Sequence, residues 1–268
     1  MRRKPSGFID ATTEGFAGRF APVSGFLGGT ESTTLNVTRD ATSGIYLPSS
    51  STEWTDFRSY FSLSAPAPDS LWLLQEASGN PADSIGAFTL TANGTVTYQQ
   101  TLSGYTRKGV GTTDNVNSRF GNQDVSLPTG GAASQTVLFI ANVPSAPAGN
   151  RSLYDGQTGC TIRINSTPRA VAISGANTAT GTVSPVGTTR PYVYRENFTA
   201  GTSTVMTDQE KLSPTHGTIS GRNLRLGSTA STASAVFGYA CAWYNANAEI
   251  SDADIKALLQ AMGFSISW

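Results

Sequence analysis

The strongest constraint on the fold is a series of short strand-like segments, separated by turns, that extends over residues 71–245. Residues 134–144, SQTVLFIANVP, are the most strand-like of them, being rich in apolar and β-branched side chains. Residues 160–165 and 169–174 flank one turn, and residues 190–197 and 202–208 flank another, so that each pair predicts a β-hairpin. Regularly spaced strands with turn signals between them predict an antiparallel sandwich.

A single amphipathic helix follows the strands. Ser251 can cap it, Asp252 and Asp254 lie in its first turn, and Gly263 ends it. Acidic residues in a first turn interact favourably with the helix dipole, which explains this pair without a catalytic role. The apolar stripe consists of Ile255, Leu258, Leu259 and Met262. We expect this helix to cover an open end of the sandwich core.

Residues 1–66 differ from the rest of the chain. Clustered Gly and Ser interrupt them, and a short helix is predicted over residues 51–63, capped by Ser51 or Thr52, with Trp54 and Phe57 on its apolar face. The segment is too short and too rich in glycine to bury a large core by itself. We therefore divide the chain into an N-terminal arm or attachment segment, 1–66, and a sandwich domain, 67–268. The arm is expected to pack on the main domain, on a sister subunit or on a partner.

Low charge limits the classes of partner. Charged residues make up 13% of the chain, with 18 basic and 18 acidic side chains. No overall field would attract nucleic acid or an anionic membrane. The local exception is the cluster Arg2, Arg3 and Lys4, which is either a solvated terminus or part of a docking arm. The candidate partner-docking residues are Arg2, Arg3, Lys4, Trp54 and Phe57.

Targeting signals are not evident in the sequence. No segment has the roughly 20 apolar residues of a membrane span, and the start lacks the apolar run of a signal peptide. We expect a chain that is made and kept in the cytosol or leaves it by another route. Cys160 and Cys241 are the only cysteines, too few for a disulfide scaffold, and we expect two buried thiols. Cys241 and Trp243 alternate along one strand, so both should face the core.

The order of these segments resembles the concanavalin A-like sandwiches of the laminin G type, in their bacterial and phage form. The resemblance covers roughly three quarters of the chain, from about residue 71 to residue 263. It implies an all-β fold, a two-sheet antiparallel jelly-roll sandwich with a short C-terminal helix and an N-terminal arm. The stretches that carry it are LWLLQEASGNPADSIGAFTL (71–90), RFGNQDVSLP (119–128), QTVLFIANV (135–143), NLRLGS (223–228) and FGYACAWYNANAEISDADIKALL (237–259).

Two departures from the family pattern concern its binding site. The hairpin turn that carries Asn-Gly in the family reads TDQEK here, over residues 207–211. The last strand has Ala240-Cys241-Ala242 where the family often has an acidic residue. Both departures weaken the transfer of a family binding site to this chain.

Catalytic and metal-binding patterns are weak. His216 is the only histidine, and a lone loop histidine is expected at the surface, because a histidine base needs a nucleophile and an orienting group. No strand carries the paired carboxylates of a glycoside hydrolase. We therefore expect no enzyme and no cofactor. Calcium remains a minor alternative, with oxygen ligands from Asp114, Asn115, Asn117 and Asp124.

Sugar binding is the more substantial alternative. Tyr105, Tyr154 and Tyr194 occur in loop-like segments near Asn and Asp, and such groups can stack on a glycan and bond to it. The other interpretation is that these rings fill the sandwich or its rim.

Two functions are consistent with the sequence. The first is a non-enzymatic structural or interaction protein of a phage virion: a capsid decoration, head-fibre or tail-associated subunit. It would be made in the host cytoplasm, would contact other particle subunits through its arm, and would form a homo-oligomer. The alternative is a free carbohydrate-binding module of a bacterial surface or secreted protein, by analogy with the fold. Glycans are possible partners in either case, whereas nucleic acid and membranes are not expected.

Overall fold

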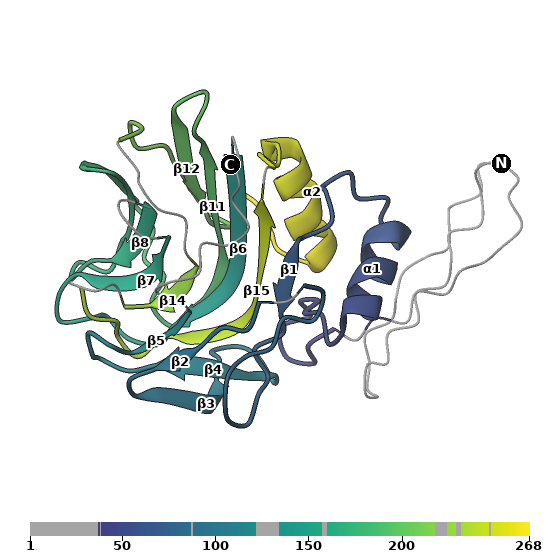
Figure 1. Ribbon diagram of the computed structural model, residues 1–268, viewed down its shortest axis with the longest axis horizontal. Helices are drawn as coiled ribbons and strands as arrows, with labels where there is room; N and C mark the ends of the chain where they lie inside the picture. Colours follow the sequence, from purple (N-terminus) through teal and green to yellow (C-terminus); the bar gives the residue numbers. More distant parts are fainter. Residues whose placement is uncertain are drawn as a thin grey trace, which may run out of the picture.

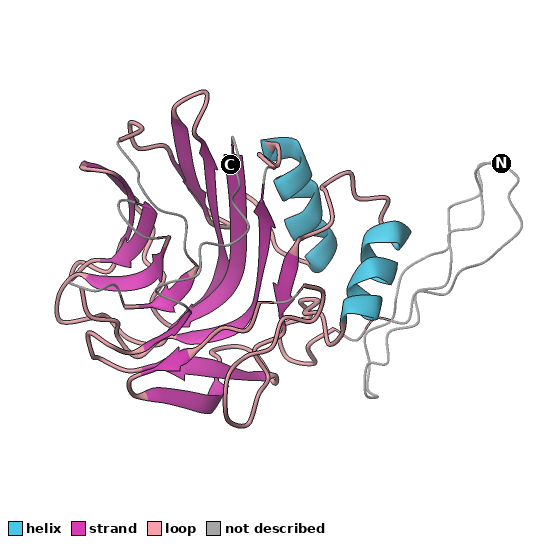
Figure 2. Ribbon diagram, in the orientation of Figure 1, coloured by secondary structure: helices cyan, strands magenta, loops and turns pink. Residues whose placement is uncertain are grey.

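Two antiparallel β-sheets stacked on each other, with helices on one outer side, form the protein (Figures 1 and 2). The computed structural model describes residues 37, 39–86, 88–121, 134–156, 160–217, 224–228, 232–246 and 248–268. The predicted all-β, two-sheet antiparallel sandwich is confirmed. Neither α1 nor α2, the helices of the described residues, is long and apolar enough to cross a membrane.

Within the described residues, eight strands form the first sheet, in the order β13-β12-β11-β6-β15-β4-β3, with β1 paired to β15. The strands are β1 (Ser70–Trp72), β3 (Val96–Thr101), β4 (Lys108–Thr112), β6 (Ser134–Val143), β11 (Thr188–Asn197), β12 (Thr202–Met206), β13 (Lys211–Leu212) and β15 (Gly238–Ala246).

Seven described strands form the second sheet, in the order β10-β9-β8-β7-β14-β5-β2. They are β2 (Ala92–Asn93), β5 (Arg119–Gly121), β7 (Arg151–Asp155), β8 (Cys160–Ile164), β9 (Ala170–Ser174), β10 (Asn177–Thr180) and β14 (Arg225–Gly227). Both predicted hairpins are confirmed, as β8–β9 and β11–β12. The strands β2, β4, β5, β7, β10 and β13 were not predicted from the sequence.

The first sheet is buried on both faces. Along β6, Phe139 and Ala141 point into the core between the sheets, whereas Leu138 and Ile140 point to the opposite side. This follows from the alternation of side chains along a strand. A near-continuous apolar run is therefore required here, since both faces exclude water.

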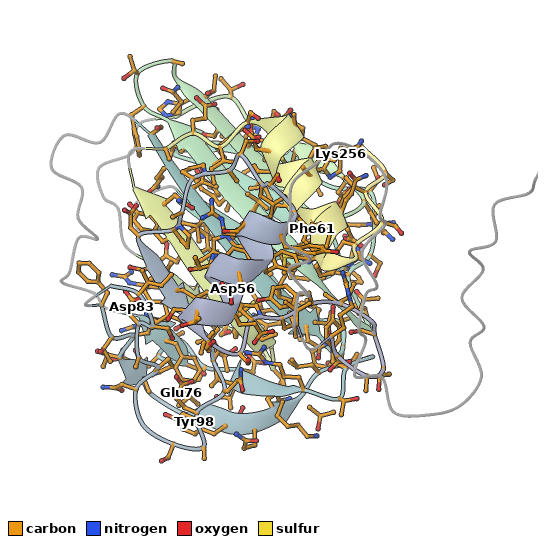
Figure 3. The ribbon with its side chains drawn as sticks, turned by 90° about the vertical axis from the view of Figure 1, so that its right-hand side faces the viewer. Asp56, Phe61, Glu76, Asp83, Tyr98 and Lys256 are labelled. Atoms are coloured by element: carbon orange, nitrogen blue, oxygen red, sulfur yellow. The ribbon has the colours of Figure 1, made fainter. Side chains whose placement is uncertain are left out.

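Helices cover the outer face of the first sheet. They are α1 (Ser51–Tyr60) and α2 (Asp252–Met262), and their buried residues belong to one apolar cluster that contains Leu138 and Trp243 of the sheet. The expectation that α2 covers an open end of the sandwich is wrong, because its stripe packs on a sheet face outside the inner core. Figures 1 and 3 show both helices on this side of the sheet.

Helix ends follow the local sequence closely. The Ser251 side chain accepts a hydrogen bond from the Asp254 N–H, and Gly263 ends α2 in the left-handed conformation, as predicted. In α1 the cap is Ser50, one residue before the predicted Ser51. Arg39 adds a long-range contact, since its guanidinium donates to the carbonyls of Ala261 and Met262 at the end of α2.

The described part of the N-terminal segment packs on the sandwich. Trp54 and Phe57 of α1 are buried, and the Phe57 ring stacks on Tyr46 with centroids 4.0 Å apart. The Trp54 ring lies 5.1 Å from that of Trp243 in β15. Of the three expected packing sites for this segment, residues 37–66 therefore use the main domain. The boundary after residue 66 stays a prediction.

Cys241 is buried, as expected, and shares a face with Trp243. That face is the one under the helices rather than the core between the sheets. A bulge between Tyr239 and Cys241 shifts the alternation of β15 and places Ala240 on the same side. The side chain of Cys160 lies outside the described residues.

Candidate functional site

Two of the three tyrosines predicted to contact glycans lie in the core. Tyr154 of β7 and Tyr194 of β11 are fully buried between the sheets, with ring centroids 5.6 Å apart. A ring without exposed surface cannot stack on a sugar from solvent, so the alternative interpretation, that these rings fill the sandwich, fits their placement. Tyr105 differs, because it is only partly buried and lies at the edge of the cluster under the helices.

Two of the five predicted docking residues are described, and both are buried within the chain. Trp54 and Phe57 face the chain's own first sheet, and this packing occupies the apolar face that was expected to meet a partner. Arg2, Arg3 and Lys4 lie outside the described residues.

An open depression of about 310 Å³ lies between residues 39–49 and the segment that leads into β4. Thr106 and Arg107, which follow Tyr105 directly, belong to its lining. The polar lining consists of Arg39, Asp40, Ser49, Gln75, Thr106 and Arg107. The depression thus brings together the N-terminal segment and the sandwich domain, two regions that the sequence separates.

Asp40 organises one wall of the depression. Its Oδ1 accepts hydrogen bonds from the backbone N–H groups of Thr42 and Ser43, at 3.1 and 2.9 Å. Its Oδ2 accepts from those of Thr106 and Arg107, at 2.9 and 2.8 Å. Partial burial raises the pKa of Asp40, but the backbone hydrogen bonds outweigh it, and the pKa falls below its ordinary value. Asp40 is therefore ionised, and its carboxylate connects the N-terminal segment to the residues that lead into β4.

Arg107 lies next to Asp40 in the lining of the depression. Its guanidinium donates to the carbonyl oxygens of Pro48 and Leu73, both at 2.7 Å, and of Ala240 at 3.3 Å. Burial lowers the pKa of Arg107, and nearby Cys241 raises it. The side chain connects the N-terminal segment to β15 and to the residue that follows β1.

These contacts define what the depression can do. The depression is an open concavity whose charged groups are paired within the chain. Tyr105 precedes the lining residue Thr106 but does not itself belong to the lining. A role of Tyr105 in binding stays a prediction, and Asp40 and Arg107 were not predicted from the sequence. Their role depends on contacts between residues more than 60 positions apart along the chain, and no local pattern encodes it.

His216 is partly buried rather than at the surface. Its Nε2 lies 3.2 Å from Oε1 of the buried Glu196, and its side chain is 19% exposed. Ser203 donates to the same carboxylate oxygen at 3.0 Å. The Phe198 ring stands perpendicular to the imidazole. The histidine therefore closes a polar cluster at the end of β11.

The predicted calcium ligands do not converge in the described part of the chain. Asp114 forms an ion pair with Arg151, with 2.7 Å between Oδ1 and Nε, and the Asn115 side chain accepts from the Asn117 N–H. Asp124 lies outside the described residues. No group of three or more His, Cys, Asp and Glu side chains suited to a metal occurs among the residues that the structure describes.

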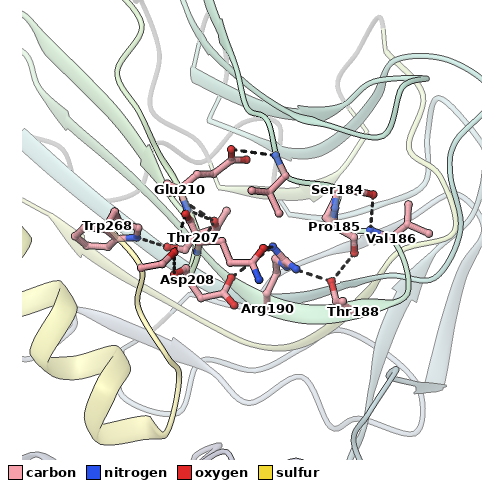
Figure 4. A network of polar contacts seen from close by, with 12 residues as sticks. Ser184, Pro185, Val186, Thr188, Arg190, Thr207, Asp208, Glu210 and Trp268 are labelled. Atoms are coloured by element: carbon pink, nitrogen blue, oxygen red, sulfur yellow. Dashed lines mark hydrogen bonds and ion pairs between the residues drawn. The ribbon is translucent and has the colours of Figure 1, made fainter.

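The turn TDQEK, at residues 207–211, carries a polar network (Figure 4). Arg190 donates to Gln209 at 3.0 Å and lies 3.7 Å from Asp208. Glu210 accepts from the backbone of Thr182 at 2.7 Å. Burial raises the pKa of Asp208, and Arg190 opposes it. The turn thus connects β12, β11 and the segment before β11, which is a structural role.

Known structures share the fold. Trypanosoma rangeli sialidase aligns with a TM-score of 0.58 at 8% identity, over 80% of this chain and 38% of the sialidase chain. The binding domain of botulinum neurotoxin DC, solved in complex with rat synaptotagmin II, aligns with a TM-score of 0.52 at 11% identity, over 75% of this chain and 55% of that chain. The aligned region spans less than two thirds of the length of either neighbour. No family model matches the chain, and no curated protein sequence matches it.

Identities this low establish a β-sandwich and nothing finer. The laminin G-like type and the phage type of the fold stay predictions.

Proposed function

We propose that this protein is a non-enzymatic structural and interaction protein, a phage-type virion component that displays a lectin-like sandwich. The non-enzymatic part is supported by the hydrogen bonds that partly buried carboxylates accept from the chain's own backbone. Asp40 and Glu210 accept backbone N–H groups. Asp83 (Figure 3) does the same for Leu71, Ile85 and Gly86, at 2.9 to 3.0 Å.

Carboxylates committed in this way hold loops in place. A general base or a nucleophile needs a free oxygen directed at a substrate. Fixed loops on a rigid sandwich suit a surface that binds without changing its partner.

The virion part of the proposal is supported by the composition and the N-terminal segment. Only 13% of the residues are charged and 28 are Gly. Residues 37–66 add a helical layer on one face of the sandwich instead of strands within it. In this proposal residues 1–36 contact other particle subunits and the chain is a homo-oligomer.

Purification of particles on a density gradient, from cultures that carry the gene, tests this part. We expect the chain in the particle fraction at a fixed ratio to the other particle proteins, and a multimer in light scattering of the pure chain. A chain found only outside the particles, and monomeric, would reject the virion role.

A free carbohydrate-binding module is the second candidate, suggested by Tyr105, the one partly exposed ring of the three selected, which precedes the lining residue Thr106 of the depression. Glycan-array binding followed by calorimetric titration tests it. We expect Tyr105→Ala to weaken binding roughly tenfold, by loss of one stacking contact. Tyr60→Ala, which changes an exposed tyrosine on α1, is the matched control and should bind normally. Absence of binding up to millimolar glycan would exclude this function.

A further inference from the structure

Two tripeptides of the same pattern pair across the second sheet. Arg119-Phe120-Gly121 forms β5 and Arg225-Leu226-Gly227 forms β14. They run antiparallel, so that Arg225 lies opposite Gly121 and Gly227 lies opposite Arg119. The two arginines are therefore diagonal neighbours on one face, with Cα atoms roughly 7–8 Å apart in such an arrangement.

The arginines occupy the outer face of this sheet. Phe120 and Leu226, which lie between each arginine and its glycine, belong to the core between the sheets. Side chains alternate along a strand, so Arg119 and Arg225 point the other way. The glycines place no side chain beside them, and a Cβ at Gly121 would lie 2.4 Å from the Leu224 carbonyl oxygen.

Asp155 of β7 is the acidic partner on this face. It lies opposite Arg225 in the adjoining strand pair. Its Oδ2 accepts from Nη1 of Arg225 at 2.9 Å, and its Oδ1 accepts from the Thr161 hydroxyl at 3.4 Å. The carboxylate is thus committed to Arg225 and Thr161.

Burial makes the charge balance of this cluster unusual. Arg119 is 3% exposed, Arg225 5% and Asp155 4%. Among the described residues, two guanidinium groups of this face lie beside a single carboxylate, in a cluster with little exposed surface.

Arg119 is the member of this cluster without a partner among the described residues. Among the described residues no hydrogen bond or ion pair reaches its guanidinium, and its Nε is buried. Burial lowers the pKa of Arg119, Arg225 lowers it further, and Asp155 raises it. Arginine nevertheless stays protonated in proteins, so the charge cannot be removed by loss of a proton. A buried charge without a partner is strongly unfavourable.

We propose that Arg119 and Arg225 form a buried binding site for an oxyanion: a carboxylate, sulfate or phosphate group. The planar guanidinium presents two parallel N–H donors to such a group, and two diagonal guanidiniums can bind it from two sides. The anion gives Arg119 its missing acceptor and offsets the positive charge of the guanidinium groups. Its source is either a free inorganic ion or the acidic group of a sugar. The site lies on the sheet away from the helices, so it stands independently of the depression.

Thermal unfolding in sodium sulfate and in sodium chloride at matched ionic strength tests the site. Wild-type protein should show a saturable rise of the melting temperature in sulfate beyond that in chloride. Arg119→Met, which keeps the side-chain volume but removes the charge, should lose this rise. It should also melt at or above the wild-type temperature without sulfate, because it removes an uncompensated buried charge. A purely structural arginine would give a lower melting temperature instead.

Matched variants and ligands refine the test. Arg169→Gln removes an arginine near β9 that forms no ion pair among the described residues, and it should respond to sulfate like the wild type. In calorimetry, Arg119→Lys should bind sulfate roughly tenfold to a hundredfold more weakly than the wild type, since an ammonium lacks the bidentate geometry. Tighter binding of glucuronate than of sulfate, with none of glucose, would identify an acidic sugar as the source. The reverse order would identify a free ion.

Two results would overturn the proposal. One is an equal response of the wild type to sulfate and chloride. The other is an Arg119→Met variant that keeps the sulfate response. If Arg119→Met does not fold, calorimetry of the wild type decides, and absence of saturable binding of both sulfate and glucuronate overturns the proposal.

Discussion

Replacing Phe57 by alanine tests whether residues 37–66 and the sandwich form one folding unit. The Phe57 ring is fully buried, with ring centroids 4.0 Å from Tyr46, 4.9 Å from Phe61 and 5.8 Å from Trp54. Truncating a buried phenylalanine costs about 3–5 kcal/mol, from lost transfer energy and the cavity that remains. For a chain of this size that loss lowers the melting temperature by roughly 6–20 °C.

The assay is urea unfolding followed by tryptophan fluorescence and by circular dichroism. Trp54 and Trp243 contribute the fluorescence signal of the contact between α1 and the first sheet, alongside Trp72 in the inner core and Trp268. Circular dichroism reports the strands. We expect coincident transitions in the wild type and a lower midpoint in Phe57→Ala by both probes. The control Tyr60→Ala removes a side chain that is 38% exposed on the same helix and should cost less than about 1 kcal/mol.

A result that separates the two probes would refute this reasoning. If Phe57→Ala shifts only the fluorescence transition, or costs less than about 1 kcal/mol, residues 37–66 are an attached arm rather than part of the folding unit. The boundary after residue 66 would then be a true domain boundary.

Three further predictions concern single residues. Asp40→Asn should lower stability at pH 7 by about 1 kcal/mol after solvent screening, whereas Asp56→Asn on exposed α1 should not. The folded pKa of Asp40 lies below its ordinary 3.8, so its contribution to stability is present above that value and is lost as the pH falls through the folded pKa. The unfolding free energies of wild type and Asp40→Asn, measured in urea, should therefore converge below about pH 4. A difference between them that does not change with pH would contradict the role of the ionised carboxylate. Burial raises the thiol pKa of Cys241 to about 12, although Arg107 opposes the shift. Cys241 should therefore resist alkylation at pH 8 until the protein unfolds, as read by peptide mass mapping. Rapid labelling of the native protein would contradict its burial. Gly263 has a φ of +108°, and an added Cβ would lie 2.9 Å from Arg39 Nη1. Gly263→Ala should therefore lower the free energy of unfolding by about 1–2 kcal/mol, as measured by thermal unfolding. A neutral result would contradict the left-handed cap of α2.

The sequence predicted elements whose signals are local. Strand β6, the hairpins β8–β9 and β11–β12, and both ends of α2 follow from apolar runs, turn residues and caps. The three-residue strand β5 was not predicted, because three residues carry little periodicity. Its pairing with β14 joins residues more than 100 positions apart in the chain.

The candidate sites depended much more on long-range contacts. Tyr105, Tyr154 and Tyr194 were all selected by residue type, although Tyr154 and Tyr194 lie in the core. Residue type alone does not say which side of a strand faces solvent when both sides of a sheet are covered.

By itself, the sequence determined that this protein is built from antiparallel strands and ends in a capped helix, because turns, caps and alternation act over a few residues. Only the tertiary structure decided which layer covers which face. It placed α2 on the outside of the first sheet, brought Asp40 to Arg107, and paired two arginine-containing tripeptides around one carboxylate. Alternation assigns a side chain to one of two faces, but the element that covers that face is fixed by packing between segments far apart in the chain.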